Sequence, residues 1–266
     1  MTDNKSAFAV NRYDENVRKV IPFYDEIYEQ IFSVIQAHCG SKPLAVLDTG
    51  CGTGTLGQMA LERLNLSELV LCDPSEKMLA DAREKLNDQP CEFHCVGSEK
   101  LDFENRFDVV TAIQSHHYFD RATRETAVKN CFKALKSGGI FICFENTAPF
   151  TKCGVSNMLK RLEDFEIKAG RTPEEVKSHS ARYDREFFPI TIKEHLELLE
   201  KTGLGLWMEE TLQKRLADTL SSAWAETDLY AALPEILQKE TLSLTGSLAG
   251  EGAASLSGMF LSMVSF

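Results

Sequence analysis

The residues with the clearest chemical meaning lie in a glycine-rich stretch, Val46 to Gly57, which reads VLDTGCGTGTLG. It contains a G-x-G-x-x-G pattern from Gly52 onward, which by itself is typical of a dinucleotide site. Asp48 and Gly50 stand just ahead of it and extend the pattern to D-x-G-x-G-x-G. Glycines after a strand let the backbone approach a ligand closely, and the following helix offers free N–H groups. The stretch therefore predicts a ligand site, and the carboxylate bears on which ligand it takes.

The charge of Asp48 separates two classes of ligand. Beside the pyrophosphate of a dinucleotide, each like-charge contact costs roughly 3–4 kcal/mol before screening. S-adenosylmethionine carries a sulfonium, an ammonium and one carboxylate, so Asp48 attracts it and the helix N-terminus can receive its carboxylate. Asp73 ends the next apolar run, LVLCD, where a carboxylate can bind the two ribose hydroxyls of either ligand. Asp48 thus favours the sulfonium ligand.

Short apolar runs alternate with amphipathic helical patterns through residues 16–146. A helix bent at Pro22 is expected over 16–37, and strands are expected over 45–48, 68–72, 91–96, 107–113 and 140–144, the last after a turn at 136–139. Further helices are expected over 54–64, 75–87 and 121–135. This alternation indicates an α/β fold with a doubly wound, mostly parallel sheet that is covered on both faces.

The alternation stops near residue 146. The charged segment 146–190, with a capping box at Thr172 and Glu175, is expected to form a helical cap over the carboxyl edge of the sheet, or else a helical decoration elsewhere. A last helix, EHLELLEKTG, is expected to end at Gly203. After it only 204–208 has a strand pattern and no seventh strand is evident. The expected units are a core over 1–145 that includes the N-terminal helix, the cap over 146–190, and an atypical C-terminal segment over 191–266.

Four stretches occur in order along the chain: VLDTGCGTGTLG, CDPSEKMLADAR, FDVVTAIQSHHYF and LKSGGIFICFEN. Together they resemble the successive motifs of the class I S-adenosylmethionine-dependent methyltransferases, over about residues 20–146. The resemblance is closest to the small-molecule branch that includes the quinone-biosynthesis enzymes. It implies a Rossmann-like sheet of seven strands with an antiparallel last strand, S-adenosylmethionine as the cofactor, and a small-molecule methyl acceptor.

The resemblance also implies which residues bind the cofactor. The predicted set is Asp48, Gly50, Cys51, Gly52, Gly54, Asp73, Pro74, Met78, Ser98, Glu99, Gln114 and Ser115. The first five surround the methionine part, Asp73 holds the ribose, and Pro74 and Met78 lie near the adenosine, although Met78 could equally be a plain core residue. The acidic residue that the family usually has after the third strand is missing or displaced to Glu99.

Adjacent histidines follow the fourth strand, at the edge where the substrate is expected. Methyl transfer is an in-line displacement in which the enzyme mainly supplies orientation, and a base is needed only if the nucleophile arrives protonated. His116 and His117 are the predicted catalytic residues, one of them as base or substrate orienter. The alternative is that they shape the cofactor wall by packing and hydrogen bonding.

The composition limits the partners that we expect. The net charge of −11 disfavours binding to nucleic acid, because phosphate backbones repel an acidic protein. The N-terminal sequence MTDNKSAFAV has no secretory pattern and no apolar run is long enough for a membrane span, so a cytoplasmic protein is expected. The eight cysteines form no C-x-x-C pair, and strand alternation places His94 opposite Cys91 and Cys95, so no metal is expected.

Other functions remain open at this stage. The protein could bind S-adenosylmethionine without turnover, as a regulatory or assembly subunit, and the unusual C-terminal segment keeps that possibility. It could modify an RNA base, which the acidic charge disfavours. An NAD-dependent oxidoreductase ranks last because of Asp48.

Overall fold

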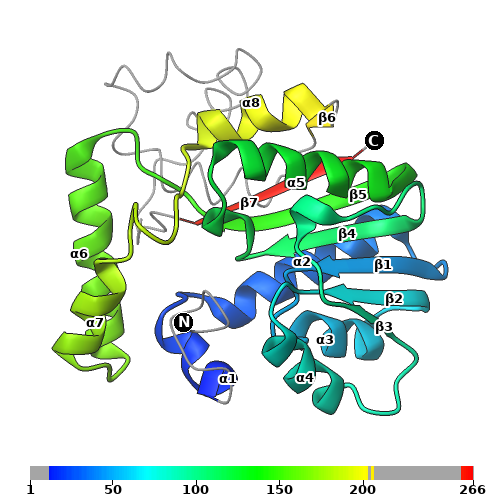
Figure 1. Ribbon diagram of the computed structural model, residues 1–266, viewed down its shortest axis with the longest axis horizontal. Helices are drawn as coiled ribbons and strands as arrows, with labels where there is room; N and C mark the ends of the chain where they lie inside the picture. Colours follow the sequence, from blue (N-terminus) through cyan, green and yellow to red (C-terminus); the bar gives the residue numbers. More distant parts are fainter. Residues whose placement is uncertain (1–11, 203–204, 207–258, 266) are drawn as a thin grey trace, which may run out of the picture.

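The computed structural model describes residues 12–202, 205–206 and 259–265, which form a seven-stranded sheet flanked by helices (Figure 1). The strands are β1 (Leu44–Thr49), β2 (Leu66–Cys72), β3 (Glu92–His94), β4 (Phe107–Ile113), β5 (Leu135–Asn146), β6 (Gly205–Leu206) and β7 (Met259–Ser265). Their order in the sheet is β3-β2-β1-β4-β5-β7-β6. Strands β1 to β5 are parallel to one another, and β7 is antiparallel to β5 and β6. The expected α/β class with a mostly parallel sheet is confirmed.

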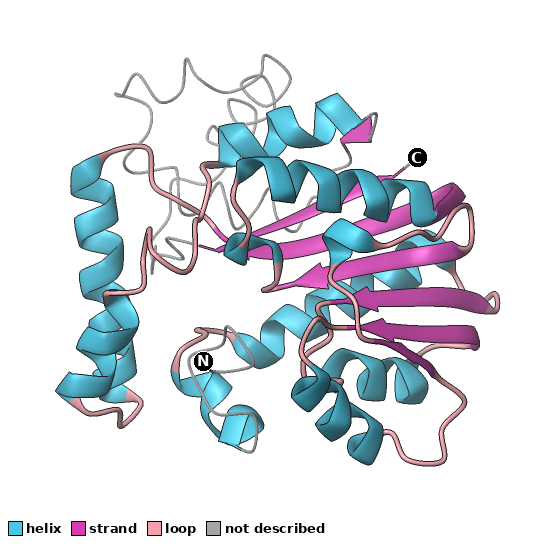
Figure 2. Ribbon diagram, in the orientation of Figure 1, coloured by secondary structure: helices cyan, strands magenta, loops and turns pink. Residues whose placement is uncertain are grey.

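The helices follow the expected alternation with the strands (Figure 2). They are α1 (Tyr13–Asn16), α2 (Tyr24–Cys39), α3 (Thr55–Arg63), α4 (Glu76–Lys85), α5 (Arg121–Ala134), α6 (Lys152–Lys168), α7 (Pro173–Ser180) and α8 (Ile192–Thr202), with single 3₁₀ turns at Val17–Lys19, Ser98–Lys100 and His116–Tyr118. The N-terminal helix is broken rather than bent, because Pro22 is followed by Phe23 in the left-handed region at φ 60°. The turn expected at 136–139 lies inside β5, where the register with β4 shifts.

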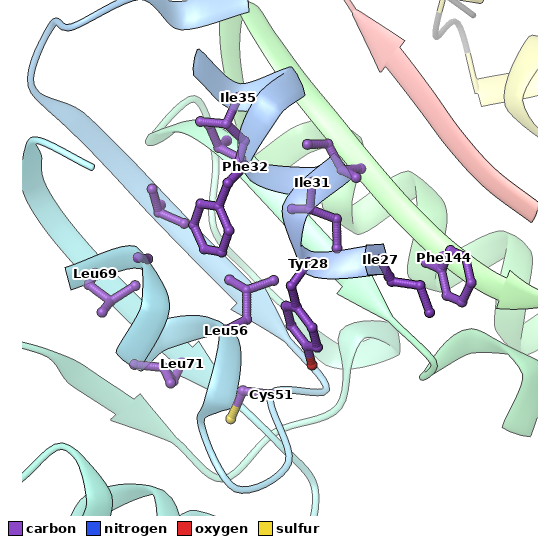
Figure 3. Packing of buried hydrophobic residues seen from close by; sticks show 14 of the residues in the cluster. Ile27, Tyr28, Ile31, Phe32, Ile35, Cys51, Leu56, Leu69, Leu71 and Phe144 are labelled. Atoms are coloured by element: carbon purple, nitrogen blue, oxygen red, sulfur yellow. The ribbon is translucent and has the colours of Figure 1, made fainter. Parts of the chain in front are cut away.

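Two hydrophobic layers hold the helices to the sheet. Successive strand residues point to opposite faces, so Val46 packs in the layer under α2 to α4 whereas Leu47 packs with α5 and α8. Figure 3 shows the first layer, in which Ile31 and Phe32 of α2 lie against the sheet and α3. Phe32 is 2% exposed, and burial of such a side chain contributes about 2–3 kcal/mol. These layers hold the strands in place, and with them the residues at the carboxyl ends of the strands.

Strand β7 corrects the expectation that the chain has no seventh strand. Residues 259–265 pair with β5 along seven positions, from Met259 opposite Asn146 to Ser265 opposite Ile140. The local sequence MFLSMVS mixes methionine and serine with apolar residues and follows a Ser/Gly/Ala-rich stretch, so it has no strong strand pattern of its own. The free edge of β5 selects it as a partner, which is a long-range effect. The expected helix end at Gly203 lies outside the described residues.

Helices α6 and α7 form a hairpin that leaves and rejoins the core at one place. Thr147 pairs with Ile190, and the Ala148 N–H donates to the Ile190 carbonyl at 2.9 Å. The expected capping box at the start of α7 is confirmed, since Thr172 and Glu175 each accept a hydrogen bond from the other's backbone N–H. Figure 1 shows the hairpin on the side of the molecule toward which the parallel strands point.

The pairing of β7 can be tested at its centre. Ser262 lies opposite Cys143, near the middle of the pairing between β5 and β7. Ser262→Pro is expected to lower the free energy of unfolding by roughly 2 kcal/mol or more, because proline has no N–H to donate and disturbs the pairing of a strand at its middle. Urea unfolding followed by circular dichroism measures this, with Ser262→Thr as the control that should stay near wild type. Equal midpoints for the proline and threonine variants would contradict the pairing.

Candidate functional site

A cavity of about 350 Å³ opens where β1, β2 and β4 end. This volume falls in the range of small-molecule sites, roughly 300–1,000 Å³. Ten of the predicted cofactor residues line it: Asp48, Gly50, Cys51, Gly52, Asp73, Pro74, Met78, Ser98, Gln114 and Ser115. The carboxyl edge of the sheet therefore brings together residues that are far apart in the chain, such as Asp48 and Ser115, which are separated by 67 positions.

The glycine loop between β1 and α3 forms the floor of the cavity. Gly50 has φ 71°, and a Cβ there would lie 2.4 Å from the Ser115 Cβ, so glycine is required for this close approach to the end of β4. The N–H groups of Gly50 and Cys51 donate to the Cys72 carbonyl at 2.7 and 3.0 Å. The loop is thus tied to the neighbouring strand, with its inner surface facing the cavity.

Asp48 is 2% exposed at the end of β1. Burial raises the pKa of its carboxyl to about 7, against the hydrogen bond from Thr111 Oγ1 at 2.7 Å, and the charge of Asp73 adds to the increase. The described lining of the cavity contains no lysine, arginine or histidine side chain that could balance this carboxylate. The site is therefore prepared for a ligand with positive charge.

Asp73 follows β2 and joins two parts of the floor. Its Oδ2 accepts the Gly52 N–H at 2.9 Å, and its Oδ1 accepts the Ser75 N–H at 2.8 Å at the start of α4. Burial raises the pKa of Asp73 although both hydrogen bonds oppose the increase. Each carboxylate oxygen can accept a further hydrogen bond, which fits the predicted role with two hydroxyl groups.

Aromatic residues form the opposite wall. Tyr13, Tyr24 and Tyr28 reach it from the N-terminal helices, and Tyr118 and Phe119 from the segment after β4. The Tyr24 and Tyr28 hydroxyls lie 3.2 Å apart and their rings meet edge to face. Tyr28 is a site residue that was not predicted, although its position one helical turn after Tyr24 places both side chains on one face of the helix.

Gln114 occupies the boundary between the glycine loop and this aromatic wall. Its backbone is left-handed at φ 53°, and its N–H donates to the Phe144 carbonyl at 2.7 Å. Its side-chain Nε2 is buried and has no hydrogen-bond partner within the described protein. A strained backbone and an unpartnered donor at one cavity residue point to a ligand group that completes the site.

The predicted catalytic histidines lie behind the wall. His116 and His117 are 2% and 3% exposed and do not line the cavity. His116 Nε2 lies 3.0 Å from Ser98 Oγ, and burial lowers the pKa of His116 to about 4. His117 Nδ1 lies 2.9 Å from Glu145 Oε2. The structure thus connects each histidine to a partner that supports the cavity rather than to the cavity itself.

Glu145 organises the segment that carries these residues. Its carboxylate, 1% exposed at the end of β5, accepts the backbone N–H groups of Ser115, His116 and His117 at 2.8–3.3 Å. Burial would raise the pKa of Glu145, but His117 and the backbone donors hold it at about 2. With its oxygens occupied in this way, Glu145 is an anchor and not a proton acceptor for substrate.

Two other predicted cofactor residues lie outside the cavity lining. Gly54 is left-handed at φ 78° and starts α3, where a Cβ would approach Ala82 at 3.1 Å, so it serves the packing of α3 on α4. The Glu99 carboxylate folds against Gly97, which does line the cavity, and its Oε2 is buried without a partner in the described chain.

Comparisons with known proteins agree with this geometry. Residues 46–139 match the family model described as a methyltransferase domain. The chain is 29% identical over 203 residues to a carboxy-S-adenosyl-L-methionine synthase of Staphylococcus epidermidis, covering 75% of this chain and 87% of that protein. It is 27% identical over 186 residues to a malonyl-acyl-carrier-protein O-methyltransferase of Acetivibrio thermocellus, covering 60% of this chain and 64% of that protein.

The fold also recurs among solved structures. Magnesium protoporphyrin IX methyltransferase from Synechocystis, solved with bound S-adenosylhomocysteine, matches with a TM-score of 0.56 and 12% identity, covering 93% of this chain and 85% of that one. The chain carries a methyltransferase domain at residues 46–139. The family resemblance of the four motifs is thereby confirmed, and the cofactor of this methyltransferase is S-adenosylmethionine. The narrower likeness to the quinone-biosynthesis branch stays a prediction.

Two further observations concern possible partners of the methyltransferase. Within the described residues, no helix has both the length and the apolar character that crossing a membrane requires. In the same part of the chain no group of three metal-ligating side chains comes together. His94 is paired instead with Glu92, at 2.6 Å.

The raised pKa of Asp48 has a consequence for stability. As pH rises from about 4 to about 7, the unfolded chain loses the Asp48 proton while the folded protein keeps it, so stability falls across this window. The full cost above pH 7 is about 4 kcal/mol. Asp48→Asn keeps an acceptor for Thr111 and removes this cost, so the variant is expected to gain about 2–3 kcal/mol more over wild type at pH 8 than at pH 5.

Thermal or urea unfolding of the ligand-free proteins at the two pH values measures this difference. Glu84→Gln, which changes an exposed carboxylate of α4, is the matched control and should show no such dependence. A gain from Asp48→Asn that does not grow between pH 5 and pH 8 would show that Asp48 is ionised at low pH.

Proposed function

We propose that this methyltransferase binds S-adenosylmethionine in the described cavity and transfers its methyl group to a small molecule by in-line displacement. The observation that carries the proposal is the pair of buried carboxylates, Asp48 and Asp73, in a cavity with no described cationic side chain. A ligand with a sulfonium and an ammonium offsets their burial, whereas a pyrophosphate would add to the repulsion.

The cofactor would lie along the floor from Asp48 to Ser98. In this arrangement Asp48 and the glycine loop hold the methionine part, and Asp73 accepts the ribose hydroxyls. Pro74, Met78 and Ser98 face the adenosine. Glu99, whose unpartnered carboxylate oxygen lies beside Gly97, would approach the adenine amine through a small side-chain rotation.

The acceptor would lie on the side of β4 and β5. Tyr118, Phe119 and Phe144 give this part a mainly apolar surface, which suits a small acceptor with an apolar or aromatic body. The Gln114 amide would orient an oxygen of the acceptor near the methyl group. His116 and His117 would act through the wall that they support, as residues that position Ser98 and the segment after β4.

The segment 146–190 would serve as a cap between the cofactor-binding core, 1–145, and the C-terminal segment, 191–266. Its helices do not line the cavity. The residues that lead back to the core are hydrogen-bonded to the segment behind the wall: the Phe188 N–H donates to the His117 carbonyl at 2.6 Å, and Arg124 donates to the Phe188 carbonyl at 2.5 Å. Movement of this segment would therefore reach the acceptor side directly.

Carboxylation of the cofactor is a second candidate function. It is favoured by the Staphylococcus epidermidis relative, whose name states that it makes carboxy-S-adenosyl-L-methionine, and by the length of that match. An incoming carboxylate would require a cation near the methyl group. Arg182 is a described candidate, since its charge opposes the burial that raises the pKa of Tyr118 to about 12. It does not line the cavity and pairs with Glu186 at 2.7 Å, so it would have to leave Glu186 to take this role.

Binding of the cofactor tests the charge argument. Asp48→Asn is expected to weaken S-adenosylmethionine binding roughly tenfold or more, since the attraction for the sulfonium and ammonium is lost. Isothermal titration calorimetry at pH 8 measures this, with Glu84→Gln as the control. NADH should not bind the wild-type protein. Binding of NADH but not of S-adenosylmethionine would overturn the proposal.

Methyl transfer is tested with methyl-labelled S-adenosylmethionine and a metabolite extract freed of macromolecules. Label is expected in a small molecule, together with S-adenosylhomocysteine. Label in added RNA would instead support base modification, a carboxylated cofactor seen by mass spectrometry would support the second candidate, and binding without turnover would support a regulatory role.

The same assay tests Gln114. Gln114→Leu removes the unpartnered donor and is expected to lower the transfer rate roughly tenfold while S-adenosylhomocysteine binding changes little. Gln58→Leu, at an exposed position of α3, is the matched control. Loss of S-adenosylhomocysteine binding in Gln114→Leu would assign the amide to the cofactor instead of the acceptor.

A further inference from the structure

The segment 12–19, which we call the strap, borders the cavity on the carboxyl side of the sheet (Figure 1). It comprises α1 and the 3₁₀ turn after it. Val17, 1% exposed, fixes one end of the strap in the hydrophobic core. Tyr13, near the other end, lines the cavity, and burial raises its pKa, with smaller contributions from Tyr24 and Tyr118. Tyr13 thus lies in the aromatic wall, near side chains from both α2 and the segment after β4.

We propose that Asp14 and Lys85 are positioning residues that hold the strap against the glycine loop and thereby retain the cofactor. This inference rests on the proposed binding of S-adenosylmethionine in the cavity. Asp14 follows Tyr13 directly in the strap, whereas Lys85 is the last residue of α4. They meet across 71 positions of sequence, so only the folded chain brings them together.

The contacts form a closed network on the loop. Thr53 Oγ1 donates to Asp14 Oδ1 at 2.6 Å, and Lys85 Nζ donates to Asp14 Oδ2 at 2.6 Å. The same ammonium donates to Thr53 Oγ1 and to Thr55 Oγ1, both at 3.1 Å. All three N–H groups of Lys85 are therefore used within the protein, which leaves none for a substrate anion.

The two threonines connect the network to the cofactor site. Thr53 and Thr55 both line the cavity, at the turn from the glycine loop into α3. Thr53 is 3% exposed, and its hydroxyl both donates to Asp14 and accepts from Lys85. A displacement of Asp14 would therefore release the strap and alter the loop that holds the methionine part of the cofactor.

The network is weak enough for the strap to separate from the glycine loop. Side-chain exposure is 47% for Asp14 and 20% for Lys85, so solvent screens the ion pair and its own contribution is small. Val17 and the core below it keep the strap folded independently of the pair. Loss of the network should therefore change the rate of cofactor release more than the stability of the whole protein.

The two residues are not expected to contribute equally. Lys85 lies beside the first residue of α3, where the helix dipole is positive and a lysine alone is unfavourable. Removing the charge of Asp14 leaves Lys85 uncompensated at that place, whereas removing Lys85 leaves Asp14 with Thr53 and the helix N-terminus. Asp14→Asn should thus have the larger effect.

The experiment measures how fast labelled S-adenosylhomocysteine leaves the full-length protein when unlabelled ligand is added in excess. Asp14→Asn is expected to speed release roughly tenfold and Lys85→Met roughly threefold. The double variant should be no faster than Asp14→Asn alone, because both changes break one network. Asp14→Glu, which keeps the carboxylate, should return the rate toward that of wild type. Melting temperatures of the ligand-free variants should stay close to wild type.

Arg83→Met is the matched control. Arg83 also lies in α4 and makes a 2.6 Å ion pair, but its partner is Glu76 and neither residue lines the cavity. Release at the wild-type rate from both Asp14→Asn and Lys85→Met, or independent effects that multiply in the double variant, would overturn the assignment. Failure of the wild-type protein to bind S-adenosylhomocysteine would instead overturn the proposed cofactor site, and this inference with it.

Discussion

Everything at this site depends on two carboxylates that the parallel sheet holds away from water. Asp48 ends β1 and Asp73 follows β2, and the register of the two strands places them at the same edge. Burial raises the pKa of both groups, so ionising these carboxylates costs more free energy in the folded protein than in water. The hydrophobic layers on the two faces of the sheet supply the stability that allows this arrangement to persist. A cationic ligand would offset the free-energy cost of burying the two carboxylates.

The segment after β4 shows how a single buried anchor can define a wall. Three consecutive backbone N–H groups and one imidazole converge on the Glu145 carboxylate. Because β4 and β5 are neighbours in the sheet, this convergence fixes the end of one strand to the end of the next. It also explains why two histidines in succession lie inside the protein, where one supports Ser98 and the other supports the anchor itself.

The strap lines the cavity through Tyr13, whereas the segment 146–190 contacts the residues behind its wall. The strap reaches the glycine loop through Asp14, and the segment 146–190 reaches His117 through Phe188. Val17 and Phe187 give each segment a buried attachment nearby, whereas the Asp14 contact consists of hydrogen bonds that are partly open to water. Such contacts open at a small free-energy cost, which suits segments that must let a cofactor and an acceptor enter.

Local sequence patterns accounted for the α/β core through β5 and for most of the cavity floor. The apolar runs of β1, β2 and β4 are buried in the sheet, and a glycine loop with Asp48 has few other uses, so the residues and their ligand could be inferred together. The capping box of α7 was equally readable, because its hydrogen bonds join residues three positions apart.

Only the tertiary structure decided the rest. β7 exists through its pairing with the edge of β5, and no pattern within residues 259–265 required it. The positions of His116 and His117 behind the wall follow from Glu145, which is 28 residues beyond the second histidine. The contact of Asp14 with Lys85 depends on how α1 and α4 meet at the loop. The sequence by itself determined the floor of the site, since local geometry specifies it, whereas the walls and closures were decided by contacts between segments far apart in the chain.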